Sequence, residues 1–418
     1  MPNVIADPRA FLTSLFETAV ARADPMHCLA EHLPPRPRGR LVVIGAGKAS
    51  ARMAEALEAV YGPCEGLVIT RYGYGRPCKG IEIVEAAHPV PDDAGVHATQ
   101  RMLALVRDLD ADDQVIALMS GGGSALLCAP VDGMTLADKK TLNAALLASG
   151  MPISQMNIVR KQVSAVKGGK LAVATYPAKL LTLTISDVPG DDPAEIASGP
   201  TVGSTATPRM ALAALLQWNV SLPDHIMRLI MNAPPPVSPQ DHRLDFSTTR
   251  IIAAPAQSLA AAADAAVGVD VSNLGDAIEG EAREVGQAHA ALAIQLAKEN
   301  HAQPILLLSG GECTVTRRGQ GIGGPNAEYV LAAGIALNGH PRIHVLACDT
   351  DGVDGAAEVA GANAGPDMSG IAAANNVSGA QALQTNDAHR FFQKIGGQIV
   401  TGPTLTNVND FRAMLILP

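Results

Sequence analysis

The chain lacks most of the features that mark nucleic-acid-binding, membrane and disulfide-stabilised proteins. Aromatic residues make up only 3% of the 418 residues, so the core must consist mainly of alanine, valine, leucine and isoleucine. The formal net charge of −9 disfavours nucleic acid or an anionic membrane as the main partner. An anionic substrate would therefore need a local basic pocket.

Targeting and zinc-binding patterns are missing as well. The N-terminus has no basic region followed by an apolar run, and no apolar run reaches the roughly 18 residues of a membrane span. The six cysteines form no CxxC pair and no zinc-ligand spacing, and most lie in apolar stretches, which predicts reduced core thiols. We expect a soluble cytoplasmic protein.

The chain is too long for one ordinary core, so two domains are expected. The clearest linker is the proline-rich segment 232–239. Strand and helix patterns alternate on both sides of it, which predicts an α/β protein with mostly parallel sheets in both domains. We predict an N-terminal α/β domain over 1–235 and a C-terminal α/β domain over 245–418.

The stretch 180–201 carries the strongest sign of a site. A buried strand over 180–185 runs into Asp187, Asp191 and Asp192, and then into Ser198-Gly199-Pro200-Thr201. Acids at the carboxyl end of a strand lie where open α/β folds bind ligands, and three close aspartates repel one another unless a cation or donors lie among them. The Ser198, Gly199 and Thr201 part suits a phosphate. The alternative is a surface turn rich in ordinary turn residues.

A glycine turn follows the predicted strand 40–44. Gly45-Ala46-Gly47-Lys48 lacks the third glycine of the dinucleotide fingerprint, and Val42 stands where a Walker A loop needs its first glycine. What remains is Lys48 at the N-terminus of a helix, where a cation is unfavourable unless an anion binds there. The alternative is a solvated surface lysine.

Two further strands lead into serine-glycine turns. Strand 114–119 continues into Ser120-Gly121-Gly122-Gly123-Ser124, and strand 305–308 continues into Ser309-Gly310-Gly311-Glu312. Glycines let the backbone approach a ligand, and serines offer hydroxyls, so both turns are predicted to cradle a phosphate or carboxylate. A tight strand-to-helix turn is the alternative.

Basic residues and a second acidic strand end complete the inventory. The predicted helix 155–174 carries Arg160 and Lys167 on one face, and His88 lies in a proline-rich loop. These three could contact an anionic substrate, or Arg160 and Lys167 could form a solvated face and His88 a plain polar contact. Asp349 and Asp351 follow strand 343–347, but no glutamate stands at the twelfth position of an EF-hand.

Phosphoryl transfer needs residues of these kinds. A lysine and backbone N–H groups neutralise the moving phosphoryl group, while carboxylates hold Mg²⁺ and one can accept the proton of the acceptor hydroxyl. No nucleophile elbow and no HExxH motif occurs. The residues alone therefore indicate a phosphate-handling α/β enzyme.

The chain also resembles, nearly end to end, the two-domain glycerate 2-kinases, long named hydroxypyruvate reductases, with their MOFRL-type C-terminal domain. The matching motifs are GAGKAS at 45–50, HPVPDDAG at 88–95, SGGGSALL at 120–127, VRKQVSAVKGGKLA at 159–172, SDVPGDDPAEIASGPT at 186–201, SGGECTVT at 309–316, DTDGVDG at 349–355 and TGPTLTNVND at 401–410. The resemblance implies ATP-dependent, Mg²⁺-dependent phosphorylation of D-glycerate at its 2-hydroxyl, in a cleft between the domains. Lys48 matches the family's cleft lysine.

Two positions depart from the family pattern. The family often has GGRN where this chain has Pro325 before Asn326, so Arg317 or Arg318 could substitute for the missing arginine. Leu405 stands where a glycine is usual.

We therefore predict three groups of site residues and a metal site. Lys48 and Asp187 are the predicted catalytic residues. Phosphate or nucleotide binding is assigned to the three serine-glycine turns, Gly45 and Gly47. The substrate is assigned to His88, Arg160, Lys167 and Asn326, and Mg²⁺ to Asp187, Asp191, Asp349 and Asp351, with Asp187 and Asp351 favoured. The partners are D-glycerate and a nucleotide, and a homo-oligomer is compatible with this prediction.

Two alternatives remain open. A nicotinamide-dependent hydroxypyruvate reductase is disfavoured by the missing third glycine and by Thr70-Arg71, which stands where the second strand would end in an acid. A non-catalytic sugar-phosphate sensor is disfavoured by the two acidic strand ends, which a sensor would not need.

Overall fold

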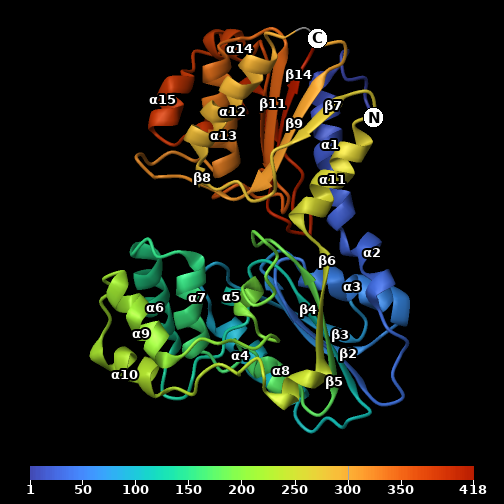
Figure 1. The fold of residues 1–418 in the computed structure, drawn as a ribbon, viewed down its shortest axis with the longest axis vertical. Helices are drawn as coiled ribbons and strands as arrows, with labels where there is room; N and C mark the ends of the chain where they lie inside the picture. The colour runs from blue at the N-terminus through green and yellow to red at the C-terminus, as the bar shows by residue number, and fades with distance from the viewer. Residues whose placement is uncertain (300) are drawn as a thin grey trace. The chain divides into compact units, whose positions relative to one another are not determined.

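The computed structural model describes residues 1–299 and 301–418. The chain forms two compact units (Figure 1). The N-terminal unit comprises Pro25–Ile252, and the C-terminal unit comprises Ala253–Pro418 together with Met1–Asp24. Each unit contains one large sheet covered by helices, so the predicted α/β class is confirmed.

The N-terminal unit is built on a six-stranded sheet in the order β3-β2-β1-β4-β5-β6. The pairs from β3 to β5 are all parallel, as predicted. The strand order reverses at β1, so β1 and β4 flank the switch point where open α/β sheets bind ligands. The strands are β1 Leu41–Ala46, β2 Glu65–Arg71, β3 Ile81–Ala86, β4 Gln114–Met119, β5 Lys179–Ile185 and β6 Ser247–Ala253.

The helices of this unit bury two apolar clusters. One cluster joins the sheet to α4 and α8, and the other lies among α6, α7, α9 and α10, which gather to one side of the sheet in Figure 1. The helices are α2 Pro25–Cys28, α3 Ser50–Tyr61, α4 Asp93–Leu105, α5 Gly123–Leu126, α6 Leu136–Ala148, α7 Ile153–Gln162, α8 Lys170–Thr175, α9 Pro208–Gln217 and α10 Asp224–Asn232.

The predicted helix 155–174 is wrong as a single element. It divides into α7 and α8 because Gly168 and Gly169 adopt left-handed backbone conformations, with φ of 61° and 80°. Lys167 therefore lies in the turn between two helices and does not share a helical face with Arg160.

The proline-rich segment does not link the two units. Val237 N–H donates to the Gly168 carbonyl at 2.9 Å, and Ser204 N–H donates to the Val237 carbonyl at 2.7 Å. The segment packs within the N-terminal unit and leads to β6, the edge strand beside β5. The chain passes between the units at residues 24–25 and again at 252–253, which differs from the predicted ranges. Composition alone signals a non-helical segment and does not show whether that segment packs.

The C-terminal unit has a sheet in the order β13-β12-β11-β14-β9-β7. Here the pairing differs from the predicted parallel pattern, because only β7 and β9 are parallel. The last strand of the chain, β14, inserts between β11 and β9 and runs antiparallel to both. The strands are β7 Asp270–Asn273, β9 Ile305–Gly311, β11 Ile343–Asp349, β12 Gly361–Ala364, β13 Gln398–Ile399 and β14 Asp410–Ile416; β8 Gly280–Glu281 pairs with β10 Cys313–Thr314.

Helices cover both faces of this second sheet. Figure 1 shows α1 and α11 on one face and α12 and α13 on the other, and an apolar cluster lies beneath each pair. The helices are α1 Pro8–Ala23, α11 Pro255–Ala265, α12 Ala282–Leu296, α13 Pro325–Leu337, α14 Met368–Ala374, α15 Gly379–Gln384 and α16 Ala388–Ile395.

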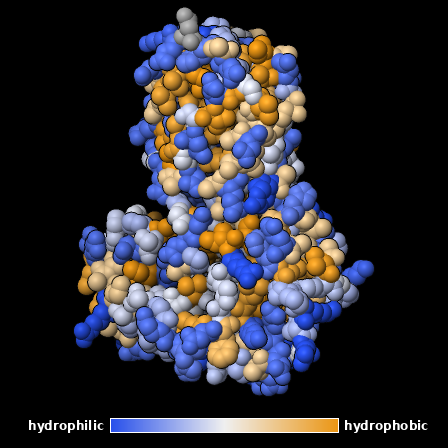
Figure 2. All heavy atoms as spheres, turned by 45° about the vertical axis from the view of Figure 1, so that its right-hand side comes forward, coloured by the Kyte–Doolittle hydropathy of each residue, from blue (hydrophilic) through white to orange (hydrophobic). Residues whose placement is uncertain are grey.

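The surface of each unit mixes polar and apolar residues (Figure 2). No helix among the described residues is both long and apolar enough to cross a membrane. The six cysteines, all among the described residues, form no disulfide, and five of them are buried, as expected for reduced core thiols.

Helix α1 begins the chain but packs in the C-terminal unit. Asp7 caps it by accepting a hydrogen bond from Ala10 N–H at 3.0 Å. Phe16 is buried, and its ring centroid lies 5.9 Å from that of Phe411 on β14.

We expect Phe16→Ala to lower the free energy of unfolding of the C-terminal unit by about 3–5 kcal/mol, because it leaves a cavity under β14. Hydrogen exchange should show faster exchange of β14 amides and unchanged exchange of β1 amides. Glu17→Ala, at an exposed position of the same helix, is the control and should change neither. Loss of protection in β1 rather than β14 would contradict the assignment of α1 to the C-terminal unit.

Candidate active site

The two glycine turns at the switch point of the N-terminal sheet are joined by hydrogen bonds. Lys48 N–H donates to the Gly121 carbonyl at 2.8 Å. The Ser120 hydroxyl is fully buried and accepts a hydrogen bond from Ala49 N–H at 3.0 Å. A Cβ on Gly47 would lie 2.1 Å from Ser120 Oγ, so this glycine is required for the close approach of the turns. Ser120 and Gly47, predicted to bind phosphate, therefore shape the turns.

Gly122 brings two predicted residues to the same place. A Cβ on Gly122 would lie 3.0 Å from the His88 ring and 3.3 Å from Lys48 Cγ. Three segments far apart in the sequence thus meet at the carboxyl edge of the sheet.

The Ser124 hydroxyl begins a chain of polar contacts. It lies 2.7 Å from the hydroxyl of Ser198, which donates to Asn157 Oδ1 at 2.9 Å. Asn157 and Lys161 both donate to Glu195, at 2.6 and 2.8 Å. This chain fixes the segment that follows β5 against α7.

The backbone of that segment is unusual. Ala197, Ser198 and Gly199 have φ of 51°, 62° and 61°, three left-handed residues in succession. Non-glycine residues adopt this conformation at a cost, and such strained backbone clusters at functional sites. The predicted Ser198 and Gly199 lie in this strained turn, and the predicted Thr201 is buried just beyond it.

Five of the predicted residues line one cavity of about 410 Å³ in the N-terminal unit. They come from the loop after β3, the turn after β4, α7 and the turn before α8; they are His88, Gly122, Ser124, Arg160 and Lys167. The cavity therefore unites much of the predicted substrate site with part of the predicted phosphate turn.

The cavity is basic. No acidic residue occurs among the described residues that line it, whereas Lys139, Lys140, Arg160 and Lys167 all do. Lys139 and Lys167 are only 4% and 1% exposed. Lys167 Nζ donates to the Leu127 carbonyl at 2.8 Å, and Lys139 Nζ has no hydrogen-bond partner among the described residues.

Sequence analysis missed Lys139, although its spacing carried a signal. It lies three and seven residues before the buried Leu142 and Leu146, so it belongs to the inward face of α6. A lysine on the apolar face of a helix is unusual enough to have been singled out.

The buried cations have shifted pKa values. Burial lowers the pKa of the Lys139 ammonium to about 8. Burial, with the nearby charges of Lys139 and Arg160, lowers the pKa of Lys167 to about 7. Burial also lowers the pKa of the Arg160 guanidinium. A bound anion would supply the missing opposite charge, so the arrangement suits an anion.

The predicted metal ligands of this unit follow β5. Asp191 has a φ of 55°, and its Oδ1 is buried without a hydrogen-bond partner among the described residues. Within the described part of the chain, no group of three or more His, Cys, Asp or Glu side chains could hold a metal ion. Mg²⁺ commonly binds through one or two carboxylates plus substrate phosphates, and Asp191 Oδ1 fits such a partial site.

In the C-terminal unit, the predicted turn after strand 305–308 is wrong, because Ser309, Gly310 and Gly311 continue β9 and pair with β14. A buried ion pair holds this end of β9. Arg412 donates to the carbonyls of Gly310 and Gly311, both at 3.0 Å, and pairs with Asp410 at 2.6 Å. The predicted Asn326 donates to the other oxygen of Asp410 at 2.6 Å and is 1% exposed. Burial raises the pKa of Asp410 and the Arg412 charge opposes that shift. Sequence analysis missed Asp410 and Arg412.

The acidic residues at and after the end of β11 form hydrogen bonds within their own loop. Asp349 accepts a hydrogen bond from Asp351 N–H at 2.9 Å, and Asp351 accepts one from Val353 N–H at 2.8 Å. Asp351 is 1% exposed. These bonds shape the turn after β11, and the metal role of both residues stays a prediction.

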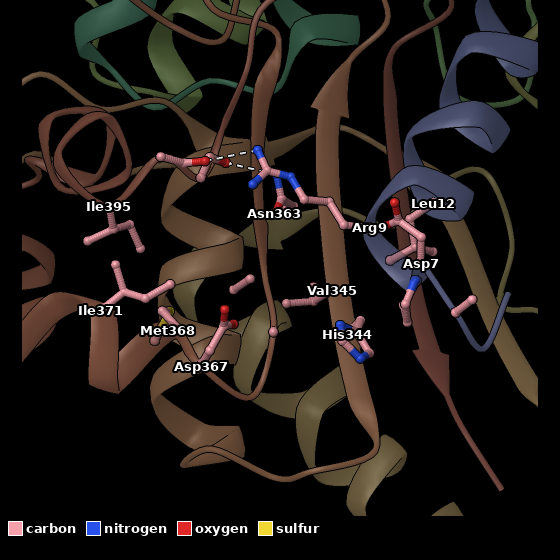
Figure 3. Close-up of a pocket in the computed structure, with 16 residues that line it drawn as sticks. Asp7, Arg9, Leu12, His344, Val345, Asn363, Asp367, Met368, Ile371 and Ile395 are labelled. Carbon is pink, nitrogen blue, oxygen red and sulfur yellow. Dashed lines mark hydrogen bonds between the residues drawn. The ribbon is translucent and has the colours of Figure 1, made fainter. Parts of the chain in front are cut away.

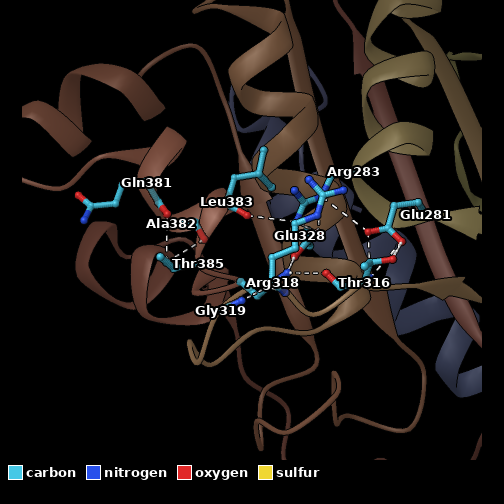
Figure 4. A network of polar contacts seen from close by, with 11 residues as sticks. Glu281, Arg283, Thr316, Arg318, Gly319, Glu328, Gln381, Ala382, Leu383 and Thr385 are labelled. Carbon is cyan, nitrogen blue, oxygen red and sulfur yellow. Dashed lines mark hydrogen bonds and ion pairs between the residues drawn. The ribbon is translucent and has the colours of Figure 1, made fainter. Parts of the chain in front are cut away.

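A polar network anchors the loop that carries Arg317 and Arg318 (Figure 4). Arg283 Nε donates to the buried Glu328 at 2.8 Å, and Asn386 donates to the other Glu328 oxygen at 3.0 Å. Asn386 in turn accepts from the backbone N–H groups of Arg318 and Gly319, at 2.6 and 3.0 Å. The loop is thus fixed at its start, while both arginines are exposed.

A second cavity, of about 190 Å³, lies in the C-terminal unit (Figure 3). Its walls come from the start of α1, from β11 and β12, and from α14 and α16. None of the predicted site residues lines it.

Comparisons with known proteins show the family. Residues 11–231 match the model of a domain of unknown function, DUF4147, and residues 305–410 match the MOFRL family. The D-glycerate 2-kinase of Thermotoga maritima is 35% identical over 96% of this chain and 97% of that protein. The chain belongs to the two-domain glycerate 2-kinase family.

Other similar proteins bear on the function. The crystal structure of the Thermotoga maritima glycerate kinase superposes with a TM-score of 0.87 at 33% identity, covering 99% of this chain and 100% of that chain. A protein of Agrobacterium vitis is 47% identical over 98% of this chain and 94% of its own length, and it is provisionally named a hydroxypyruvate reductase. The family's two names therefore both occur among similar proteins.

We expect sulfate to raise the melting temperature of the protein more near pH 6.5 than near pH 9. The pKa values of Lys139 and Lys167 are lower in the folded protein than in the unfolded chain. The unfolded chain therefore holds more protons between about pH 7 and pH 10, and the free energy of unfolding rises with pH in that range. A bound anion restores their protons, so its stabilising effect is largest where both are charged. The other titratable groups acting on them are Arg160, Lys170 and the Cys128 thiol.

Differential scanning calorimetry would measure this effect. Sodium chloride at equal ionic strength controls for screening of surface charges. An equal sulfate effect at both pH values would argue against anion binding by these lysines.

Proposed function

We propose that this protein transfers the γ-phosphoryl group of ATP to the 2-hydroxyl of D-glycerate. The observation that carries the proposal is the basic cavity at the glycine turn of Gly122, close to Lys48, whose described lining residues include no acid. Membership of a family whose relatives are named glycerate 2-kinases and glycerate kinases supports the substrate. The free cysteines are consistent with a cytoplasmic enzyme.

In the proposed reaction, the 2-hydroxyl oxygen attacks the γ-phosphorus while the bond to the oxygen shared with the β-phosphate breaks. The Lys48 ammonium neutralises charge on the moving phosphoryl group. Asp187 accepts the hydroxyl proton, and ADP leaves with the bridging oxygen. Mg²⁺, which enters with ATP, supplies charge neutralisation on the nucleotide oxygens.

We expect Lys48→Ala to lower kcat by a factor on the order of hundreds, since removing one such donor typically costs roughly 3–4 kcal/mol. Lys48→Arg should restore only part of the rate, because a planar guanidinium does not replace a compact ammonium. Steady-state ADP formation measures both variants, and thermal melting checks that they fold. A Lys48→Ala enzyme with normal kcat and a raised KM would show that Lys48 only binds substrate.

We expect single Asp→Asn changes at Asp187, Asp191, Asp349 or Asp351 to raise the Mg²⁺ concentration needed for half-maximal activity. Not all four should do so, because Mg²⁺ usually takes one or two carboxylates. Mg²⁺ titrations of the initial rate measure the effect. Asp192→Asn, at an exposed neighbouring position, is the control. An unchanged titration curve in all four variants would exclude them as ligands.

A nicotinamide-dependent hydroxypyruvate reductase is the second candidate function. The strand order β3-β2-β1-β4-β5-β6, which is that of dinucleotide-binding folds, and the name of one similar protein favour it. However, β2 ends in Thr70-Arg71, where an acid would hold the ribose, and the Thr70 hydroxyl donates to the Gly47 carbonyl at 3.1 Å. An assay that follows NADH with hydroxypyruvate in parallel with ADP from D-glycerate separates the two activities.

A further inference from the structure

Helix α6 carries a buried cation, Lys139, at the wall of the cavity. Lys139 is 4% exposed and lines the cavity, and its Nζ has no hydrogen-bond partner among the described residues. A buried charge without a partner opposes folding, so a purely structural role for this lysine is unfavourable.

One turn further along α6, Asn143 shows the same feature. It also lines the cavity, and its side-chain oxygen is buried with no hydrogen-bond partner in the described part of the chain. Residues four apart lie on the same helix face, so the ammonium and the amide are neighbours. A ligand that meets both would carry an anionic group and, close to it, a hydroxyl.

Two further cations from outside α6 lie near Lys139. Arg160 and Lys167 line the same cavity, and the charges of Arg160 and Lys139 both act on Lys167. Lys167 Nζ already donates one hydrogen bond to the Leu127 carbonyl, whereas Lys139 Nζ makes none to the described residues.

The lining also distinguishes between the two anionic substrates of the proposed reaction. The phosphates of ATP bind together with Mg²⁺, which needs a carboxylate or water-filled polar site nearby. None of the described residues that line the cavity is acidic. The cavity therefore suits an anion that carries no metal ion.

We propose that Lys139, supported by Arg160 and Lys167, binds the carboxylate of the hydroxy-acid substrate, and that Asn143 binds a hydroxyl of the same molecule. This inference rests on the proposed function and assigns one substrate to the cavity. It makes Lys139 the residue that distinguishes a hydroxy acid from an uncharged polyol such as glycerol.

The test is Lys139→Met in the full-length protein. It should raise the KM for D-glycerate at least about tenfold, as expected for loss of a charged hydrogen bond, and leave the KM for ATP unchanged. Lys139→Arg should recover part of the affinity, and Asn143→Ala should raise the same KM less. Lys179→Met, which removes an exposed lysine at the start of β5, is the matched control.

Thermal melting separates binding from a structural role. Because Lys139→Met replaces an unpaired buried charge by an apolar side chain, it should raise the melting temperature of the unliganded protein. A lower melting temperature would mean that Lys139 supports the fold, which would overturn the inference.

The kinetic outcomes are also distinct. If the wild-type protein forms no ADP with D-glycerate, the proposed function itself is wrong. If it is active but Lys139→Met changes only the KM for ATP, the cavity binds the nucleotide. An active variant with both KM values unchanged would show that Lys139 binds neither substrate.

Discussion

Parallel pairing of β1 with β4 is the constraint on which the candidate site depends. Their register places Ala46 beside Met119, so the turns that follow the two strands begin at the same level. Lys48, on one turn, is then hydrogen-bonded through its backbone to the other turn at Gly121. Any side chain at position 47 would collide with Ser120 and force the turns apart. The position of Lys48 thus follows from sheet topology and from one small residue.

The cationic cavity acts against the stability of the unliganded fold. Lys139 and Lys167 are buried, and the low polarity that lowers their pKa values also makes an anion bind more strongly there than at the surface. Burying these two cations lowers the stability of the unliganded fold. An apolar cluster on α6 and α7, which includes Leu142, Leu146 and Val159, offsets that loss. A change that makes this helical part more stable is therefore expected to weaken anion binding, and the reverse.

Local sequence patterns predicted the elements whose position depends on neighbouring residues. The strands that precede the turns at Lys48 and Ser120 lie close to their predicted positions, because each is an apolar run that ends in glycines. Long-range arrangements were beyond such patterns. The insertion of β14 between β9 and β11 and the packing of α1 in the C-terminal unit both depend on partners far along the chain. The metal ligands and the roles of the site residues stay predictions.

The departures from the family pattern have a local physical basis. Pro325 is the first residue of α13, where proline fits the helix start but offers no side-chain donor for a phosphate. Leu405 has a φ of 63°, a left-handed conformation that glycine adopts more readily, which accounts for the glycine usual there. The loop that starts with Arg317 and Arg318 is tied through Asn386 to the buried Glu328. If one of these arginines replaces the missing one, the network that fixes their backbone is what makes the replacement effective.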